Sequence, residues 1–177
     1  MDDSGDPVIL VDDEDRELGE MGKMAAHLRA ISVCVYDPRG RMLLQRRAEQ
    51  KYHSGGLWTN ACCTHPRPGE SIERAARRRL GEELGIDVPL RYLLRTHYRA
   101  DVGSGLVENK IVHLFIGLHS GSVIPNPDEV AEFAWAREHD LRADVAHSPA
   151  AYTYWFKHYL EAYGDALFGQ SPAPQAA

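Results

Sequence analysis

Apolar stretches and short polar turns alternate through the first third of the chain, which predicts strands joined by hairpins. Val8 to Val11 is apolar, ends in an acidic segment and is followed by Leu18-Gly19, which indicates a small N-terminal hairpin. Ile31 to Tyr36 and Met42 to Gln45 are apolar or β-branched and flank the turn Asp37-Pro38-Arg39-Gly40. These two runs predict a second hairpin, which enters the hydrophobic core.

The next segment, from Lys51 to Gly69, carries glycines, prolines and histidines without any periodicity. A polar segment of this length is expected to be a loop, and long loops often carry function. The clearest helix follows it, from Ser71 to Leu84, because its apolar residues recur at helical spacing near one face. Ser71 can cap this helix, and Gly85 can end it.

The second half of the chain alternates in the same way. Strands are expected from Leu90 to Tyr98, from Val107 to Leu118 and from Phe133 to Trp135, with the turn-prone residues Asp101 to Gly105 between the first two. Ala150 to Tyr163 is rich in aromatic residues and predicts a C-terminal helix. The 177 residues suit one domain. We therefore expect a single domain over 1–165, followed by a disordered tail at 166–177.

Composition narrows the class of protein. Hydrophobic residues make up 44% of the chain and charged residues 26%, as in ordinary globular proteins, and no apolar run approaches the ~20 residues of a membrane span. The N-terminus lacks the basic and apolar regions of an export signal, so a cytoplasmic location is expected. The net charge of −6 argues against a nucleic-acid partner, although basic residues clustered at 39–51 and 74–79 indicate a local anion site.

Reactive side chains are densest between Gly56 and Pro66. The three cysteines of the chain, Cys34, Cys62 and Cys63, suit neither a disulfide framework nor a zinc knuckle and are expected to be free thiols. Cys63 and His65 are two residues apart, so an extended strand directs both side chains to the same side. Such a pair can move a proton or bind a metal, or it can be a buried structural cysteine beside an ordinary loop histidine.

The predicted helix carries part of a Nudix box. In the full motif, carboxylates along one helical face hold Mg²⁺ on a diphosphate. Arg79 stands where the motif has its key glutamate and Thr64 where it has its first glycine, which disfavours hydrolysis. An arginine at that position would instead bind phosphate oxygens, although Glu/Arg runs are usually salt-bridged surface helices. The positions that match the motif are Glu70, Arg78, Glu82 and Glu83.

The stretch WTNACCTHPRPGES, at 58–71, resembles the cysteine motif of type I isopentenyl diphosphate isomerases. Tyr98-Arg99-Ala100 and Val107-Glu108-Asn109 resemble that family's second catalytic segment, and the similarity extends from about Val8 to Tyr163. The resemblance implies a Nudix-type α/β/α sandwich of the α+β class with a mixed central sheet. It also implies a divalent-metal enzyme of isoprenoid and terpenoid biosynthesis, which moves the double bond between isopentenyl and dimethylallyl diphosphate.

The resemblance further implies roles for particular residues. Cys63 is the expected catalytic thiol, and Tyr98 and Glu108 are the other expected catalytic residues. Glu83 would hold Mg²⁺ beside the diphosphate. The ligands of a second divalent ion, Zn²⁺ or Mn²⁺, would be His27, His65 and Glu108. The substrate-binding residues would be Lys23, Arg47, Lys51, Arg79 and Trp58.

Protonation of the alkene gives a carbocation, which water would trap, so the active site is expected to be dry. Aromatic faces stabilise a desolvated cation by about 2 kcal/mol or more. The candidates for that role, each of which can equally belong to the core, are Trp58, Tyr98, Tyr152, Tyr154 and Trp155.

Three positions depart from the family pattern. Leu28 or Arg29 stands where the family has a metal-binding histidine, and Lys110 stands where it has a second metal-binding glutamate that donates or accepts a proton. Lys110 would place a positive charge near the metal and the carbocation unless it is neutral or turned away. Ala150 replaces a tryptophan over the substrate, which would leave room for a longer chain.

These departures leave four functions to distinguish. The first is isomerisation of isopentenyl diphosphate, with the second acid or base shifted to another group. The second is a terpene cyclase-like reaction, in which protonation starts the cyclisation or rearrangement of a longer prenyl chain. The third is binding of a prenyl diphosphate without catalysis, and the fourth is Nudix hydrolysis, which Arg79 disfavours. The protein is expected to be a monomer or a homodimer.

Overall fold

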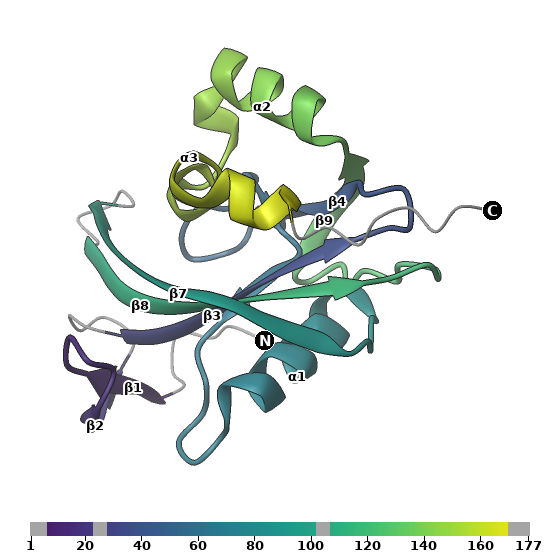
Figure 1. Ribbon diagram of the computed structural model, residues 1–177. Coiled ribbons are helices and arrows are strands. Elements are labelled where there is room, and N and C mark those ends of the chain that lie inside the picture. Colours follow the sequence, from purple (N-terminus) through teal and green to yellow (C-terminus); the bar gives the residue numbers. More distant parts are fainter. Residues whose placement is uncertain (1–6, 23–27, 102–106, 170–177) are drawn as a thin grey trace.

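A mixed sheet lies between two layers of helices in the computed structural model, which describes residues 7–22, 28–101 and 107–169 (Figure 1). The strands are β1 (Pro7–Val11), β2 (Glu17–Gly22), β3 (Leu28–Tyr36), β4 (Met42–Arg47), β5 (Trp58–Asn60), β6 (Cys62–Thr64), β7 (Leu90–Asp101), β8 (Val107–Leu118) and β9 (Val130–Ala136). The helices are α1 (Ile72–Leu84), α2 (Glu138–His147) and α3 (Tyr154–Gly169), and a 3₁₀ turn occupies Pro149–Ala151.

Strand β3 organises the sheet. It pairs with β8 in parallel and with β6 antiparallel, and it meets β1 and β4 at its two ends. The predicted hairpin of β3 and β4 is present, but its strands separate after the pair Tyr36 and Met42 because β4 continues alongside β5 and β9. The parallel β3–β8 pair among antiparallel neighbours makes the sheet mixed, as expected.

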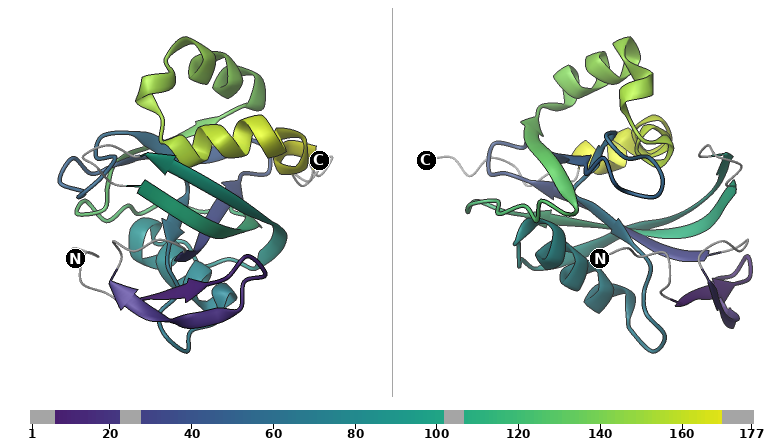
Figure 2. Two further views of the ribbon diagram at one scale, coloured as in Figure 1. Left: turned by 90° about the vertical axis from the view of Figure 1, so that its left-hand side faces the viewer. Right: turned by 180° about the vertical axis from the view of Figure 1, so that it is seen from behind.

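Alternate residues of β3 pack into two different cores. Val33 and Val35 belong to the cluster that α1 covers, whereas Cys34 and Tyr36 belong to the cluster that α3 covers. A strand buried on both faces has apolar residues at almost every position, which is why this segment shows no polar alternation. Two further views show α1 on one side of the sheet and α2 with α3 on the other (Figure 2). The expected α/β/α sandwich is therefore confirmed.

Helix α1 begins and ends where its sequence predicts. The Oγ of Ser71 accepts a hydrogen bond from the backbone N–H of Arg74 at 3.3 Å, which satisfies one of the free donors of the first turn. Gly85 ends the helix with φ of 65°, in the left-handed region that a residue without a Cβ adopts at no steric cost.

Two expectations about the loops and the helices were wrong. The segment 51–69 contains β5 and β6, because three-residue strands are too short to produce a visible hydrophobic period. Helix α2 was missed because Leu141 is its one buried residue, so its sequence carries almost no apolar face.

The C-terminal helix also differs from expectation in its limits. It begins at Tyr154 and continues to Gly169, so residues 166–169 are helical and do not belong to a tail. The backbone carbonyl of the fully buried Leu167 accepts a 2.9 Å hydrogen bond from the Tyr36 hydroxyl, which attaches this last turn to the sheet. Residues 170–177 and most of the turn expected at 101–105 lie outside the described residues.

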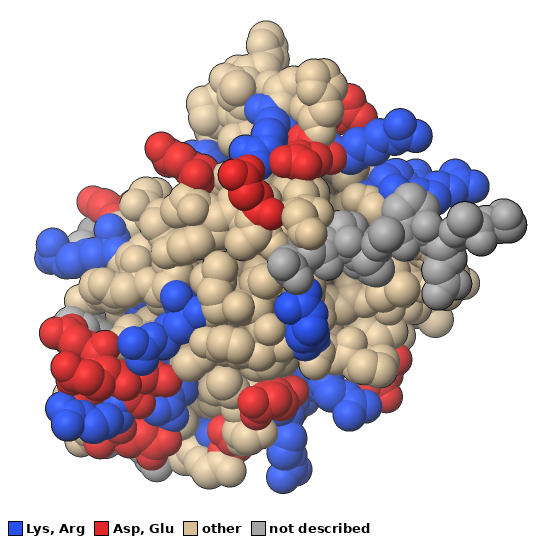
Figure 3. Space-filling model, in the orientation of Figure 1, with Lys and Arg blue, Asp and Glu red and all other residues tan. Residues whose placement is uncertain are grey.

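The surface carries charges of both signs. On the face shown in Figure 3, acidic and basic side chains are interspersed, and acidic ones gather where Figure 1 shows the hairpin of β1 and β2. All three cysteines are free thiols, as expected. Among the described helices, none combines the length and the apolar character needed to cross a bilayer.

Candidate active site

A cleft gathers reactive side chains from both helical layers and from the sheet. The empty space that it encloses is about 540 Å³, including its open mouth. Its walls come from β3, β4, β6, β7, β8, α1, α3 and the segment after β4. The lining residues are Ala30, Ile31, Ser32, Arg47, Lys51, Tyr52, His53, Cys63, Thr64, His65, Arg79, Tyr98, Lys110, Val112, Trp155 and Tyr159.

Strand alternation in β6 separates the two adjacent cysteines. Cys62 is 1% exposed and packs in the core under α1, whereas Cys63 is half-buried and lines the cleft. His65, two residues further, lines the same cleft. The two-residue spacing therefore placed Cys63 and His65 in one cleft, as the sequence predicted, and Cys63 is only partly buried where it packs against the core.

The thiol of Cys63 lies in a line of hydrogen bonds. Its Sγ is 3.0 Å from the Oγ of Ser32, the residue opposite it on β3, and that hydroxyl is 3.0 Å from the Tyr159 hydroxyl on α3. On its other side, the thiol donates to the Oδ1 of Asn60 at 3.4 Å. Hydroxyl groups can donate or accept, so this line can hold the sulfur either as a thiol or as a thiolate.

Asn60 is held in one orientation by partners on both ends of its amide. Its Nδ2 donates to the carbonyls of Val33 at 2.9 Å and Cys62 at 3.0 Å, which leaves Oδ1 toward the thiol. Thr59 also donates to this Oδ1, and the Thr59 hydroxyl accepts from the Trp155 indole at 2.9 Å. A buried, fully partnered group of this kind fixes the position of the side chain that it contacts.

Burial raises the pKa of the Cys63 thiol above its ordinary value, because the thiolate loses its hydration. The hydrogen bond with the Ser32 hydroxyl acts in the opposite direction but does not offset the burial. The resting group is therefore a neutral thiol that can donate a proton.

Three basic side chains line one part of the cleft. Arg47 is 9% exposed; its Nη2 donates to the carbonyl of His53 at 3.2 Å, and its guanidinium lies 5.5 Å from the centre of the Trp155 ring. Lys51 pairs with the buried carboxylate of Glu129. Arg79, from α1, contacts the same carboxylate at 2.6 Å. The structure thus brings together the expected anion-binding residues Arg47, Lys51 and Arg79.

Glu83 lies next to Arg79 and is 3% exposed. Its Oε1 is 2.5 Å from the Nε of Arg79, and its Oε2 accepts from the Nε2 of Gln45 at 2.5 Å. Burial raises the pKa of Glu83, and the charge of Arg79 counteracts that rise. Both oxygens that a hard cation would bind are therefore engaged by protein donors.

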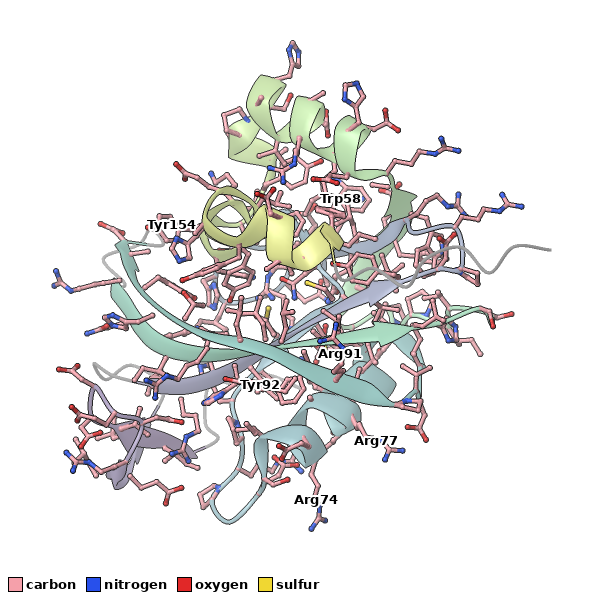
Figure 4. The ribbon with its side chains drawn as sticks, viewed as in Figure 1. Trp58, Arg74, Arg77, Arg91, Tyr92 and Tyr154 are labelled. Carbon is pink, nitrogen blue, oxygen red and sulfur yellow. The ribbon has the colours of Figure 1, made fainter. Side chains whose placement is uncertain are left out.

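The aromatic candidates divide between cleft and core. Tyr98 and Trp155 line the cleft. Trp58 does not; it packs against the core cluster of the α2 and α3 layer, where Figure 4 labels it. The Tyr152 ring is buried and stacks on Phe156, and its hydroxyl donates to Asp144. Tyr154 is 42% exposed and contacts Tyr98 from outside the lining.

Several predicted site residues fall outside the described residues. Lys23 and His27 belong to the segment 23–27, and Glu108 is described only as a backbone position of β8. Among the side chains that are described, no three His, Cys, Asp or Glu gather as metal ligands. Of the three ligands expected for the second metal ion, only His65 belongs to the described side chains.

The structure shows where two of the residues that differ from the family pattern lie. Ala150 is exposed on the 3₁₀ turn and is not part of the lining, so the expectation that it enlarges the cleft is wrong. Lys110 is 8% exposed and lines the cleft, which excludes the alternative that it is turned away.

Sequence reasoning missed several lining residues, among them Ser32, His53 and Tyr159. Ser32 interrupts an otherwise apolar strand, and a lone hydroxyl in a strand buried on both faces is the signal that could have identified it. Tyr159 looked like one of many core aromatics on α3, and no spacing in the sequence links it to Ser32.

Comparisons with known proteins agree with this geometry. Residues 26–156 match the NUDIX domain model. Two isopentenyl-diphosphate Delta-isomerases of Aromatoleum aromaticum are each 49% identical to the chain. The match to the first covers 85% of this chain and 82% of the relative, and the match to the second covers 86% of this chain and 89% of the relative. The enzyme of that name from Burkholderia multivorans is 46% identical, over 89% of the chain and 92% of the relative.

Solved structures show the same fold at low sequence identity. A protein from Deinococcus radiodurans superposes with a TM-score of 0.74 at 19% identity, over 89% of this chain and 99% of that one. A MutT NUDIX hydrolase from Burkholderia pseudomallei gives a TM-score of 0.61 at 23% identity, over 77% of this chain and 98% of that one. These likenesses show a Nudix fold.

Proposed function

The chain belongs to the isopentenyl-diphosphate Delta-isomerase family within the Nudix superfamily, and from this premise we propose roles for the residues of its cleft. The protein is an isomerase of isoprenoid biosynthesis, which interconverts isopentenyl diphosphate and dimethylallyl diphosphate. The reaction adds a proton to the terminal alkene carbon and removes one from the carbon nearer the diphosphate, so it needs two proton-transfer groups and no net oxidant.

Cys63 is the first proton-transfer group. The observation that carries this assignment is the half-buried thiol in the cleft, which is hydrogen-bonded to Ser32 and Asn60. A raised pKa keeps the proton on sulfur in the resting state, and the Ser32 hydroxyl can donate a hydrogen bond to the thiolate once the proton has left. Lys110 stands where the family has its second proton-transfer group, so that role would pass to another group of the cleft, and Tyr98, which also lines the cleft, would orient the acid.

The diphosphate would bind to Arg47, Lys51 and Arg79, with Lys23 from the segment outside the described residues. In the described part of the chain, the buried Nε of Arg47 has no hydrogen-bond partner, so this guanidinium retains a donor for a phosphate oxygen. A planar guanidinium suits the paired oxygens of a phosphate group better than an ammonium does.

Mg²⁺ would bind at Glu83 once the diphosphate is present. Glu83 has the hard oxygen donors that Mg²⁺ prefers, but Arg79 holds one of them in the unliganded protein. A diphosphate that draws Arg79 toward itself would release this carboxylate. The metal would then neutralise charge on the diphosphate, and the two ligands would bind cooperatively.

The rest of the lining would exclude water from the reacting carbon atoms. Tyr98, Trp155 and Tyr159 are buried side chains of the cleft, and an aromatic face stabilises a nearby cation electrostatically. Trp155 is positioned by its hydrogen bond to Thr59, so its ring cannot rotate freely. We also propose a cytoplasmic location, and a monomer or homodimer as the working form.

The function is tested by incubating the purified protein with Mg²⁺ and isopentenyl diphosphate in deuterated water. Deuterium-labelled dimethylallyl diphosphate is expected, because the proton that is added exchanges with solvent. Absence of labelled product, or release of free phosphate, would refute the isomerase function. A cyclic product from a longer prenyl diphosphate would support the terpene cyclase-like reaction instead.

A further inference from the structure

Two departures from the family pattern are neighbours in the sheet. Leu28 of β3 is the register partner of Lys110 of β8, and the two residues are 4% and 8% exposed. Both positions are expected to hold metal ligands, a histidine at one and a glutamate at the other. The two replacements therefore affect one small region beside the cleft.

The geometry identifies Leu28 as the replaced histidine position. Ala30 and Ser32 line the cleft, and Leu28 has the same phase in β3. The Arg29 side chain lies on the other face of the strand, where its Nε is 2.9 Å from the Oδ1 of Asp15. An apolar side chain thus stands where a ligand would be needed.

The ammonium group of Lys110 cannot act as a metal ligand. An ammonium group has three donors and no lone pair, and it repels any divalent cation close to it. Its cross-strand partner on β7, Tyr98, lines the same part of the cleft. His65 is a potential ligand in the same lining, and the other two ligands implied by the family resemblance, His27 and Glu108, lie outside the described side chains.

We propose that the Lys110 ammonium takes the place of the second divalent metal of this cleft. The positive charge that a metal would supply beside Tyr98 is then a fixed part of the chain. The proposal takes only the position of the cleft from the proposed function. It leaves the Mg²⁺ at Glu83 untouched, since that carboxylate lies on α1.

The test measures bound metal rather than turnover. Purified wild-type protein is dialysed, analysed by mass spectrometry for Zn²⁺ and Mn²⁺, and titrated with each ion. We expect no retained metal and weak binding. The double variant Leu28→His/Lys110→Glu restores both ligands and should retain about one equivalent, with an affinity at least about tenfold higher than wild type. Lys157→Glu makes the same charge change outside the cleft and should bind metal as the wild type does.

One equivalent of tightly bound Zn²⁺ or Mn²⁺ in the wild type, lost in His65→Ala, would overturn the proposal. The wild-type measurement stands even if the double variant does not fold, which its circular dichroism spectrum reveals. The isomerase assay is separate. A wild-type protein that isomerises but retains this metal contradicts the inference alone, and one that retains no metal and gives no product contradicts the proposed function alone.

Discussion

The Oγ of Ser32 lies 3.0 Å from the Sγ of Cys63, and the two residues face each other across the β3–β6 pair. The sequence identified Cys63 as a candidate site residue but not Ser32. The contact also connects the sulfur to the Tyr159 hydroxyl on α3. The chemistry of Cys63 therefore depends on a serine 31 positions away in the chain.

Replacing each of the adjacent cysteines separates a catalytic thiol from a structural one. Cys63→Ala should lower kcat for isopentenyl diphosphate by at least about a hundredfold, because it removes a proton-transfer group. Cys62→Ala should leave kcat near wild type and cost roughly 1 kcal/mol of stability, because it removes buried volume. Steady-state kinetics and thermal unfolding measure the two effects. Similar rates for the two variants would contradict the assignment of Cys63.

Ser32→Ala tests the hydrogen bond to the sulfur. Its loss should lower kcat by about tenfold, on the order of one hydrogen bond to a charged group, while KM changes little. Because Ser32 stabilises the thiolate, the pH at which Cys63 becomes reactive toward iodoacetamide should move upward. Ser120→Ala, at an exposed site, is the matched control. An unchanged alkylation profile would show that Ser32 only packs against the sulfur.

The contact between Arg79 and Glu83 predicts linked binding of Mg²⁺ and diphosphate. Isothermal titration should show Mg²⁺ binding at least about tenfold more tightly when inorganic pyrophosphate is present, equivalent to about 1.4 kcal/mol of coupling. Arg79→Met should weaken pyrophosphate binding and strengthen Mg²⁺ binding in its absence, since Glu83 is then released. Arg77→Met, which removes an exposed arginine paired with Asp87, should change neither. Equal Mg²⁺ affinities with and without pyrophosphate would exclude the coupling.

His113 predicts a loss of stability in mild acid. Burial lowers its pKa, and the charge and hydrogen bond of Asp15 offset this only in part. The unfolded chain binds the proton at about pH 6.5, above the folded value, so stability is full above that pH and declines as the pH falls through the folded pKa. Thermal unfolding of His113→Asn should therefore depend less on pH between about 7.5 and 5.5. The exposed His139→Asn should behave as wild type, and an identical slope for all three proteins would refute this account.

The sequence alone determined the local features that depend on neighbouring residues. Ser71 and Gly85 set the limits of α1, the two-residue spacing placed Cys63 and His65 in one cleft, and a mostly apolar run predicted that β3 enters the core. Capping, strand alternation and two-sided burial each act within a few residues, so a linear pattern records them.

Tertiary structure decided what depends on contacts between distant segments. Only the pairing of β3 with β6 and β8 brings Ser32 to Cys63 and Leu28 to Lys110, and only the packing of α3 adds Tyr159. Those contacts follow from strand register and from the packing of a helix on the sheet, which a one-dimensional pattern does not encode. The same reason explains why Trp58 and Ala150, which local motifs pointed to, lie outside the cleft while Trp155 lines it.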